Sequence, residues 1–265
     1  MKSLNQYINE VSSDLLKRAH NEQVRRNNGV ESNRSRKFAK GAHAALDREM
    51  SLDDSVSGTE RRYDYVDLGL PSGTMWATCN VGATKPEDEG LLFQFGRVDG
   101  YKYGDRKNQF ITNDKNKQDT GNKFTPLTPS GKVYKTNELL DLGDDAAHVN
   151  MGGKWRMPTK NDLEELLNNT SYEVETINGV KGIMFTSNIN GNQLFIPFMQ
   201  GCWYNGYWET WEVSYATIWS CQVHASNVDY AYRLNLDSEG GDAGAFVEGA
   251  YTRNYAFTVR GVFKK

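Results

Sequence analysis

The stretch GGKWRMPTKNDLEELLNN, residues 152–169, decides how the central part of the chain folds. Thr159 is a good helix N-cap, and Asp162 follows three positions later in a variant of the capping box. Pro158 restricts Met157 to extended geometry, so the helix cannot begin earlier. The helix then carries one apolar stripe, formed by Leu163, Leu166 and Leu167. Trp155 and Met157 alternate with Arg156, so both can pack under the helix start. We therefore interpret the stretch as a packing corner of a scaffold.

Strand patterns surround this corner. Upstream, residues 63–70 and 74–81 are predicted strands around a turn at 71–73, and 136–149 is a predicted helix. Downstream, Asn178-Gly179 between two β-prone runs is a strong hairpin signal. Residues 193–198 and 215–223 are further predicted strands. Few helices, many short strands and long loops predict an α+β domain over residues 62–265.

The run 228–237 shows the clearest alternation. Its even positions are apolar or aromatic and its odd positions are mostly polar. Such a period of two predicts a strand with one face in the core and the other toward solvent. Residues 255–263 alternate in a similar way and predict a last strand.

Residues 1–61 differ from the rest and are interpreted as a helical arm and linker. The first 50 residues hold ten Lys and Arg against six Asp and Glu, while the whole chain has a net charge of −3. One helical stripe, at spacings of four, three and four, consists of Leu4, Ile8, Val11 and Leu15. We expect this stripe to mediate attachment or assembly into a homo-oligomer, a dimer or trimer. The alternative is an amphipathic helix that lies on its own body.

Composition excludes several classes of function. Hydrophobic residues make up 38% of the 265 residues, and the mean hydropathy is −0.70. The acidic balance argues against a nucleic-acid partner. No apolar run is long enough for membrane insertion, and the first residues do not form a secretory signal. The three cysteines, an odd number, favour synthesis in a reducing cytoplasm over a disulfide framework.

No catalytic residues, metal site or cofactor are predicted. Cys221 and His224 have a C-x-x-H spacing, but on a strand these two positions point to opposite faces. The acidic pair Asp144-Asp145 is interpreted as helix-start or solvent charge. Cys79 is expected to be a small core residue.

The candidate binding residues are aromatic. Four of the six tryptophans, Trp203, Trp208, Trp211 and Trp219, fall within 19 residues, with tyrosines between them. Trp219 is expected in the core. Tyr and Trp are suited to sugar stacking and to interface anchors. We expect the loops 204–211 and 238–254 to converge on one exposed face, with the candidate ligand-binding residues Tyr204, Tyr207, Trp208, Trp211, Tyr251 and Arg253.

Two long motifs resemble a known family. They are YVDLGLPSGTMWATCNVGA at residues 65–83 and DDAAHVNMGGKWRMPTKNDLEELL at 144–167, and the ending FTVRGVF at 257–263 is similar to the family's last strand, where VRPV is more usual. Together they resemble the Fibrobacter major paralogous domain family over about residues 63–263. The resemblance implies a C-type-lectin-like domain with antiparallel strands and long loops, in which the first and last strands pair. The calcium-binding E-P-N, Q-P-D and W-N-D motifs of such lectins do not occur.

Three hypotheses of function follow. The first is a non-enzymatic bacteriophage virion protein, a head or tail fibre or decoration protein. It would be made in the host cytoplasm, bind other virion proteins through the arm, and display a lectin-like head for adhesion to a host-surface glycan or protein. The second is a bacterial protein-interaction module. The third, a formylglycine-generating-type oxidase, would need a reactive pair of Cys202 and Cys221, and nothing in their aromatic setting would lower a thiol pKa.

Overall fold

The structure is a computed structural model of the 265-residue chain, and it describes residues 57–60, 62–105, 128–204, 207–210, 214–238 and 244–265. The expected helical arm and linker, residues 1–61, therefore fall outside the described residues except for 57–60, and so does the stripe of Leu4, Ile8, Val11 and Leu15. The described part is a body built mostly of antiparallel strands with few helices. This confirms the expectation of a strand-rich domain with mixed secondary structure.

The largest sheet has seven strands. Its path runs β12-β11-β10-β13-β8-β9, and β4 pairs with β13 beside that path. All its pairings are antiparallel except that of β10 with β13. The strands are β4 (Leu92–Gln94), β8 (Gly201–Tyr204), β9 (Tyr207–Thr210), β10 (Tyr215–Val223), β11 (Tyr230–Asp237), β12 (Gly244–Thr252) and β13 (Ala256–Thr258).

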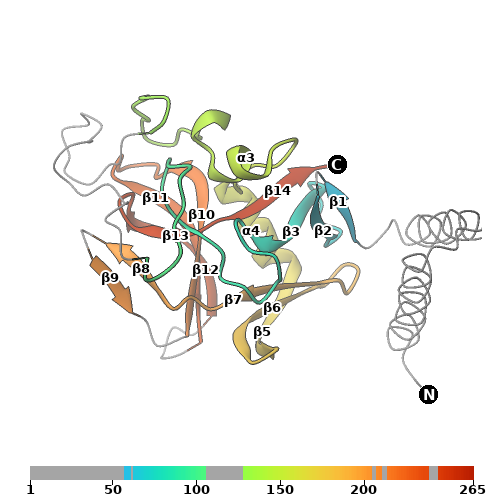
Figure 1. Cartoon of the computed structure of the whole chain (residues 1–265). Coiled ribbons are helices and arrows are strands. Elements are labelled where there is room, and N and C mark those ends of the chain that lie inside the picture. The colour runs from blue at the N-terminus through green and yellow to red at the C-terminus, as the bar shows by residue number, and fades with distance from the viewer. Residues whose placement is uncertain (1–56, 61, 106–127, 205–206, 211–213, 239–243) are drawn as a thin grey trace, which may run out of the picture. The chain divides into compact units, whose positions relative to one another are not determined.

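Two smaller sheets complete the body. One has the order β1-β2-β3-β14, with β1 (Ser57–Glu60), β2 (Tyr63–Asp67), β3 (Thr74–Asn80) and β14 (Arg260–Lys264). The other is β5-β6-β7, with β5 (Thr170–Ile177), β6 (Val180–Ser187) and β7 (Gln193–Pro197). Only Val259 separates β13 from β14, so the end of the chain passes from the largest sheet directly into the first small one (Figure 1).

The body begins before the expected boundary at residue 62. β1 pairs antiparallel with β2, from Ser57 opposite Val66 to Glu60 opposite Tyr63. The carbonyl of Glu60 also accepts a hydrogen bond from Trp155 Nε1 at 2.9 Å. Chain contacts accordingly group residues from Ser55 onward into one compact unit.

The packing corner at residues 152–169 forms as its sequence predicts. α4 (Lys160–Asn169) starts at Thr159, and the reciprocal capping box with Asp162 is present. Ahead of the helix, Arg156 exchanges both backbone hydrogen bonds with Val262 of β14, at 3.0 and 2.8 Å. The Pro158 carbonyl accepts from Cys221 N of β10 at 2.8 Å. The corner thus joins the last strand to the centre of the largest sheet.

The predicted helix over 136–149 is wrong. The segment is not one helix: a turn at 136–137 and the β-bridge residue Leu139 precede the 3-10 helix η1 (Leu142–Asp144) and the start of α3 (Ala146–Met151). Leu139 forms a β-bridge with Gln222, and Leu140 N donates to the Cys221 carbonyl at 2.8 Å. Pairing with β10 therefore replaces the local helical bonds. Asp145 caps α3 instead, through a 2.8 Å bond from His148 N.

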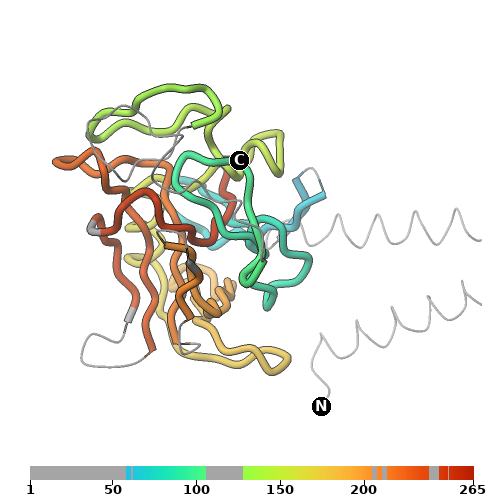
Figure 2. Tube along the Cα trace, turned by 60° about the vertical axis from the view of Figure 1, so that its left-hand side comes forward, coloured from blue at the N-terminus to red at the C-terminus, as the bar shows by residue number. Residues whose placement is uncertain are grey.

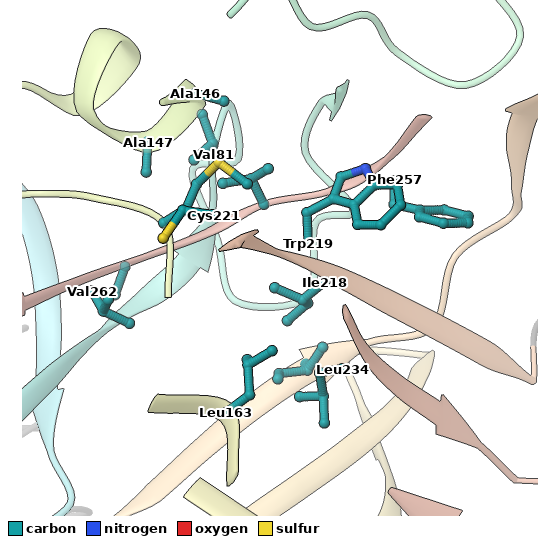
Figure 3. Packing of buried hydrophobic residues seen from close by; sticks show 14 of the residues in the cluster. Val81, Ala146, Ala147, Leu163, Ile218, Trp219, Cys221, Leu234, Phe257 and Val262 are labelled. Carbon is teal, nitrogen blue, oxygen red and sulfur yellow. The ribbon is translucent and has the colours of Figure 1, made fainter. Parts of the chain in front are cut away.

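One continuous cluster of buried apolar side chains fills the body. Trp155 and Trp219 both have 0% exposure, which confirms their expected place in the core. Figure 3 shows part of the cluster, where Leu163 of α4, Ile218 of β10 and Leu234 of β11 face one another. Cys79 is only half-buried, so its expected role as a core residue was wrong.

The hairpin β5–β6 also forms as predicted. Asn178 and Gly179 have φ values of 50° and 86°, the left-handed geometry that a tight hairpin turn requires. The hairpin extends away from the other strands (Figure 2), and successive residues 171–174 of β5 are exposed.

Candidate functional site

A pocket of about 380 Å³ lies over one face of the largest sheet. Its wall consists of Glu209, Tyr215, Arg233, Asn235, Glu248, Tyr251 and Tyr255. These residues come from β9, β10, β11, β12 and the turn before β13. Since β9 and β12 stand at opposite ends of the strand path, the sheet must curl for both to reach one pocket.

The polar face of β11 forms the floor of this pocket and does not face solvent. Arg233 is 3% exposed and Asn235 is 9% exposed. Leu234 and Leu236, on the opposite face, are also buried. The expectation of one solvent-facing side on this strand was therefore wrong. Polar and apolar residues do alternate along β11, but both faces of the strand are buried. Residues of β12 and of the turn before β13 line the pocket over the polar face, because the sheet curls.

Arg233 organises the floor. Its Nη2 donates to Glu248 Oε2 at 2.9 Å, directly across the β11–β12 pair, and its Nη1 donates to Thr217 Oγ1 at 3.0 Å. The guanidinium carbon lies 3.5 Å from the centre of the Tyr251 ring. Burial lowers the pKa of Arg233, and the carboxylate of Glu248 opposes that shift. Nε is buried without a hydrogen-bond partner among the described residues.

Stacked tyrosines form one wall. Tyr204 and Tyr255 lie 4.1 Å apart at 14°, and Tyr251 meets Tyr255 edge-on at 5.0 Å. Tyr255 is also stacked on Phe257 of the core at 5.5 Å. Burial raises the pKa of Tyr255, and neighbouring groups, first Tyr204, add to the shift. The phenol therefore stays protonated at neutral pH and keeps its hydroxyl as a donor.

The remaining polar groups are only partly used by the protein. Glu209 Oε2 accepts from the Cys202 thiol at 3.6 Å, and Asn235 Oδ1 accepts from Thr217 at 3.4 Å. Within the described part of the chain, the second carboxylate oxygens of Glu209 and Glu248 and the amide nitrogen of Asn235 have no hydrogen-bond partner. Among the described residues, these atoms therefore keep hydrogen-bonding capacity that a polar ligand could use.

The expected binding residues are only partly brought together. Tyr251 lines the pocket, and Tyr204 contacts its wall through Tyr255. The Trp211 residue and the side chain of Tyr207 lie outside what the structure describes.

Two of the expected exposed residues are not exposed anchors. Trp208 is half-buried, packs edge-on against Trp203 at 5.4 Å and Tyr103 at 5.1 Å, and donates from Nε1 to the Asp105 carbonyl. Arg253 is 0% exposed, so its expected place on the surface was wrong.

Arg253 has a structural position instead. Its guanidinium carbon lies 4.8 Å from the centre of the Phe95 ring, and Nη1 donates to the Val228 carbonyl at 3.0 Å. Its backbone also bonds to Phe95 and Asp229. Burial lowers its pKa to about 10.

Sequence reasoning missed most of the pocket wall, namely Glu209, Tyr215, Arg233, Asn235, Glu248 and Tyr255. One feature of the sequence could have indicated the pocket: Arg233 and Asn235 lie two positions apart, on the same face of one predicted strand. Such a face is ordinarily solvated. Its burial depends on the distant residues of β9 and β12, which the local pattern does not reveal.

The cysteines are not prepared for nucleophilic chemistry. Burial, followed by the charge of Asp145, raises the pKa of Cys221 to about 12. Burial and then the carboxylate of Glu209 raise the pKa of Cys202. Both thiols are therefore protonated at neutral pH, whereas an oxidase of the formylglycine-generating type would need a reactive thiolate.

Within the described ranges, no three His, Cys, Asp or Glu side chains gather closely enough to hold a metal ion. Asp144 and Asp145 accept hydrogen bonds within the body, from Tyr134 Oη at 2.7 Å and from Met157 N at 2.8 Å. In the same residues, no helix is long and apolar enough to cross a membrane.

Comparison with known proteins identifies no relative. No protein-family model, no curated protein and no solved structure matches this chain.

Proposed function

We propose that this chain is a non-enzymatic structural protein of a bacteriophage virion, a head or tail fibre or decoration protein. Its body would be a recognition domain that adheres to a glycan or protein on the host surface. Residues 1–61 would attach the body to other virion proteins and assemble the chain into a dimer or trimer. The protein would be made in the host cytoplasm and would require no cofactor and no nucleic-acid partner.

The observation that carries this proposal is the tyrosine-walled pocket. Its wall combines stacked aromatic rings with carboxylate and amide groups whose hydrogen-bonding capacity the described residues leave partly unused. Concave sites with convergent polar groups are typical of ligand binding. The raised pKa of both buried thiols favours recognition over cysteine chemistry.

We also propose that the body has a C-type-lectin-like fold, as its motifs imply. The last strand, β14, pairs antiparallel with β3, which is next to β2 in the first motif. The last strand thus shares a sheet with the first strands of the body, although its direct partner is β3 and not the first strand; this shared sheet supports the proposal. An experimental structure that superimposes on lectin-like domains through β2, β3 and β14 would test it.

Adsorption tests the recognition role. The labelled full-length protein should adsorb to cells of a susceptible bacterial strain and not to receptor-deficient mutants of that strain. Adsorption should persist in EDTA, because the motifs predict no calcium site. Antibody against the protein should label purified phage particles. Absence from particles, together with a specific bacterial protein captured from the lysate, would instead identify an interaction module.

A further inference from the structure

We propose that the pocket over β10, β11 and β12 is a saccharide site for an uncharged sugar unit, and that it disfavours acidic sugars. The inference rests on the proposed adhesion role and specifies the chemistry of its ligand. A volume of about 380 Å³ is near the lower end of the range for small-molecule sites. It suits roughly one or two sugar rings.

The wall is preorganised for such a ligand. Tyr255 is held between Tyr204 and Phe257, at interplanar angles of 14° and 21°. Tyr251 is held by the guanidinium of Arg233 and by the edge of Tyr255. Rings fixed in this way lose little side-chain freedom when a ligand binds, which favours affinity. Because Tyr204 and Phe257 cover the faces of Tyr255, this residue offers a ligand its ring edge and its hydroxyl, and not a face for stacking.

The polar groups complement sugar hydroxyls. Glu248 Oε2 is occupied by Arg233, so Oε1 can accept from one hydroxyl, and Glu209 Oε1 can accept from another. Asn235 Nδ2 can donate to a hydroxyl oxygen. Sugar hydroxyls both donate and accept, so two or three hydroxyls of one ligand can satisfy all three atoms. An apolar ligand of the same size would leave these groups without partners, which is costly.

The charges set the selectivity. Two carboxylates, Glu209 and Glu248, and one guanidinium, Arg233, line the pocket, which leaves one excess negative charge. Arg233 Nη1 and Nη2 are engaged by Thr217 and Glu248 and its guanidinium lies against Tyr251, while Nε has no partner among the described residues but is itself buried. An incoming carboxylate would therefore meet Glu209 without a free cation to balance it. Acidic sugars should bind more weakly than their neutral counterparts for this reason.

A printed array tests the class of ligand. The probes are neutral hexose and N-acetylhexosamine disaccharides, and the same disaccharides with a terminal uronic acid or with a free amine. The full-length protein should bind at least one neutral disaccharide, and the matching uronic acid should bind about 5-fold more weakly, since Glu209 is exposed and its charge is screened by solvent. Stronger binding to the uronic acid than to the neutral form would overturn the proposal, whereas binding of the amine-bearing form at least as strong as that of the neutral form would support the charge argument, because the excess negative charge attracts a cation.

Matched variants then locate the site. Tyr215→Ala should weaken binding to the best neutral disaccharide at least about 10-fold. Tyr172→Ala, at an exposed position on β5, should change it less than about twofold. Unchanged binding in Tyr215→Ala would place the sugar elsewhere and overturn the assignment.

A second pair removes charge without removing bulk, which guards against a misfolded Tyr215 variant. Glu209→Gln should lower the ratio of neutral-disaccharide binding to uronic-acid binding by about 3-fold or more. Glu173→Gln makes the same change of net charge at an exposed position on β5 and should leave this binding ratio unchanged. Equal effects of the two would overturn the charge argument. Cell adsorption without array binding would reject the saccharide site and keep the adhesion role, whereas loss of both would reject the adhesion role itself.

Discussion

The guanidinium carbon of Arg233 lies 3.5 Å from the centre of the Tyr251 ring, and Nη2 of the same guanidinium donates to Glu248 Oε2 at 2.9 Å. One buried cation thus fixes both an aromatic ring and a carboxylate of the pocket wall. Arg233 is a positioning residue in this arrangement, since Tyr251 and Glu248 present the surfaces that a ligand would meet. The positive charge of Arg233 is tolerated in the interior because Glu248, Thr217 and the ring of Tyr251 all interact with it.

Breaking this pair should destabilise the body. Glu248→Ala leaves the guanidinium of Arg233, which is 3% exposed, without its carboxylate. We expect a loss larger than the ~1 kcal/mol of an exposed pair and up to about 3–5 kcal/mol. Urea unfolding measures the difference. Glu164→Ala, which breaks the exposed pair with Lys160 on α4, is the control and should cost about 0.5 kcal/mol or less. Equal losses of unfolding free energy in the two variants would mean that Glu248 stabilises the buried charge of Arg233 no more than an exposed partner would.

The packing corner should tolerate truncation poorly. Trp155 has 0% exposure and packs edge-on against Phe263 at 4.8 Å. Trp155→Ala should cost about 3–5 kcal/mol, the usual result of emptying a large aromatic site. Trp208→Ala should cost less because that ring is half-buried. Thermal melts of the two variants provide the comparison, and similar losses would contradict the assignment of core and periphery.

Glu89 should make stability fall as pH rises toward neutrality. Burial raises its pKa from 4.5 to about 7, against opposing hydrogen bonds from Gln200. Between these two values the folded state binds a proton that the unfolded state does not, so raising the pH disfavours folding. Glu89→Gln should therefore stabilise the protein at pH 8 by an amount on the order of 1–3 kcal/mol, and by much less at pH 4.

Denaturant unfolding at the two pH values tests the effect of Glu89. Glu173→Gln, at an exposed position, is the control and should show little dependence on pH. A Glu89→Gln difference that stays constant between pH 4 and pH 8 would refute the raised pKa.

The arm should carry the assembly. Ile8→Asp should abolish oligomers while the body stays folded, because a buried unpaired carboxylate costs several kcal/mol. A shortened chain that begins at Ser55 should also be monomeric, and it retains β1, which pairs with β2. Sedimentation analysis gives the masses. If the shortened chain assembles as well as the full-length protein does, the assignment of the arm fails.

Sequence alone predicted the elements whose signals are local. The capping box at Thr159 and Asp162 forms, the Asn178-Gly179 hairpin forms, and β10 has the expected limits of 215 and 223. In the first two cases the deciding interaction lies within a few residues of the chain: a side chain bonds to a nearby amide, or a turn adopts left-handed geometry. Local chemistry of this kind depends little on the rest of the molecule.

Only the tertiary structure decided which polar surfaces become buried. Residues 136–149 do not form one helix because distant β10 supplies backbone partners to residues 137–140, as in the 2.8 Å bond from Leu140 N to Cys221 O. Arg253 is in the interior because Phe95 and Val228 surround it, and the polar face of β11 becomes a pocket floor because the sheet curls. An alternation with a period of two shows that the two faces of a strand differ in polarity. Which of them meets water depends on strands far away in the chain, and no local pattern encodes that contact.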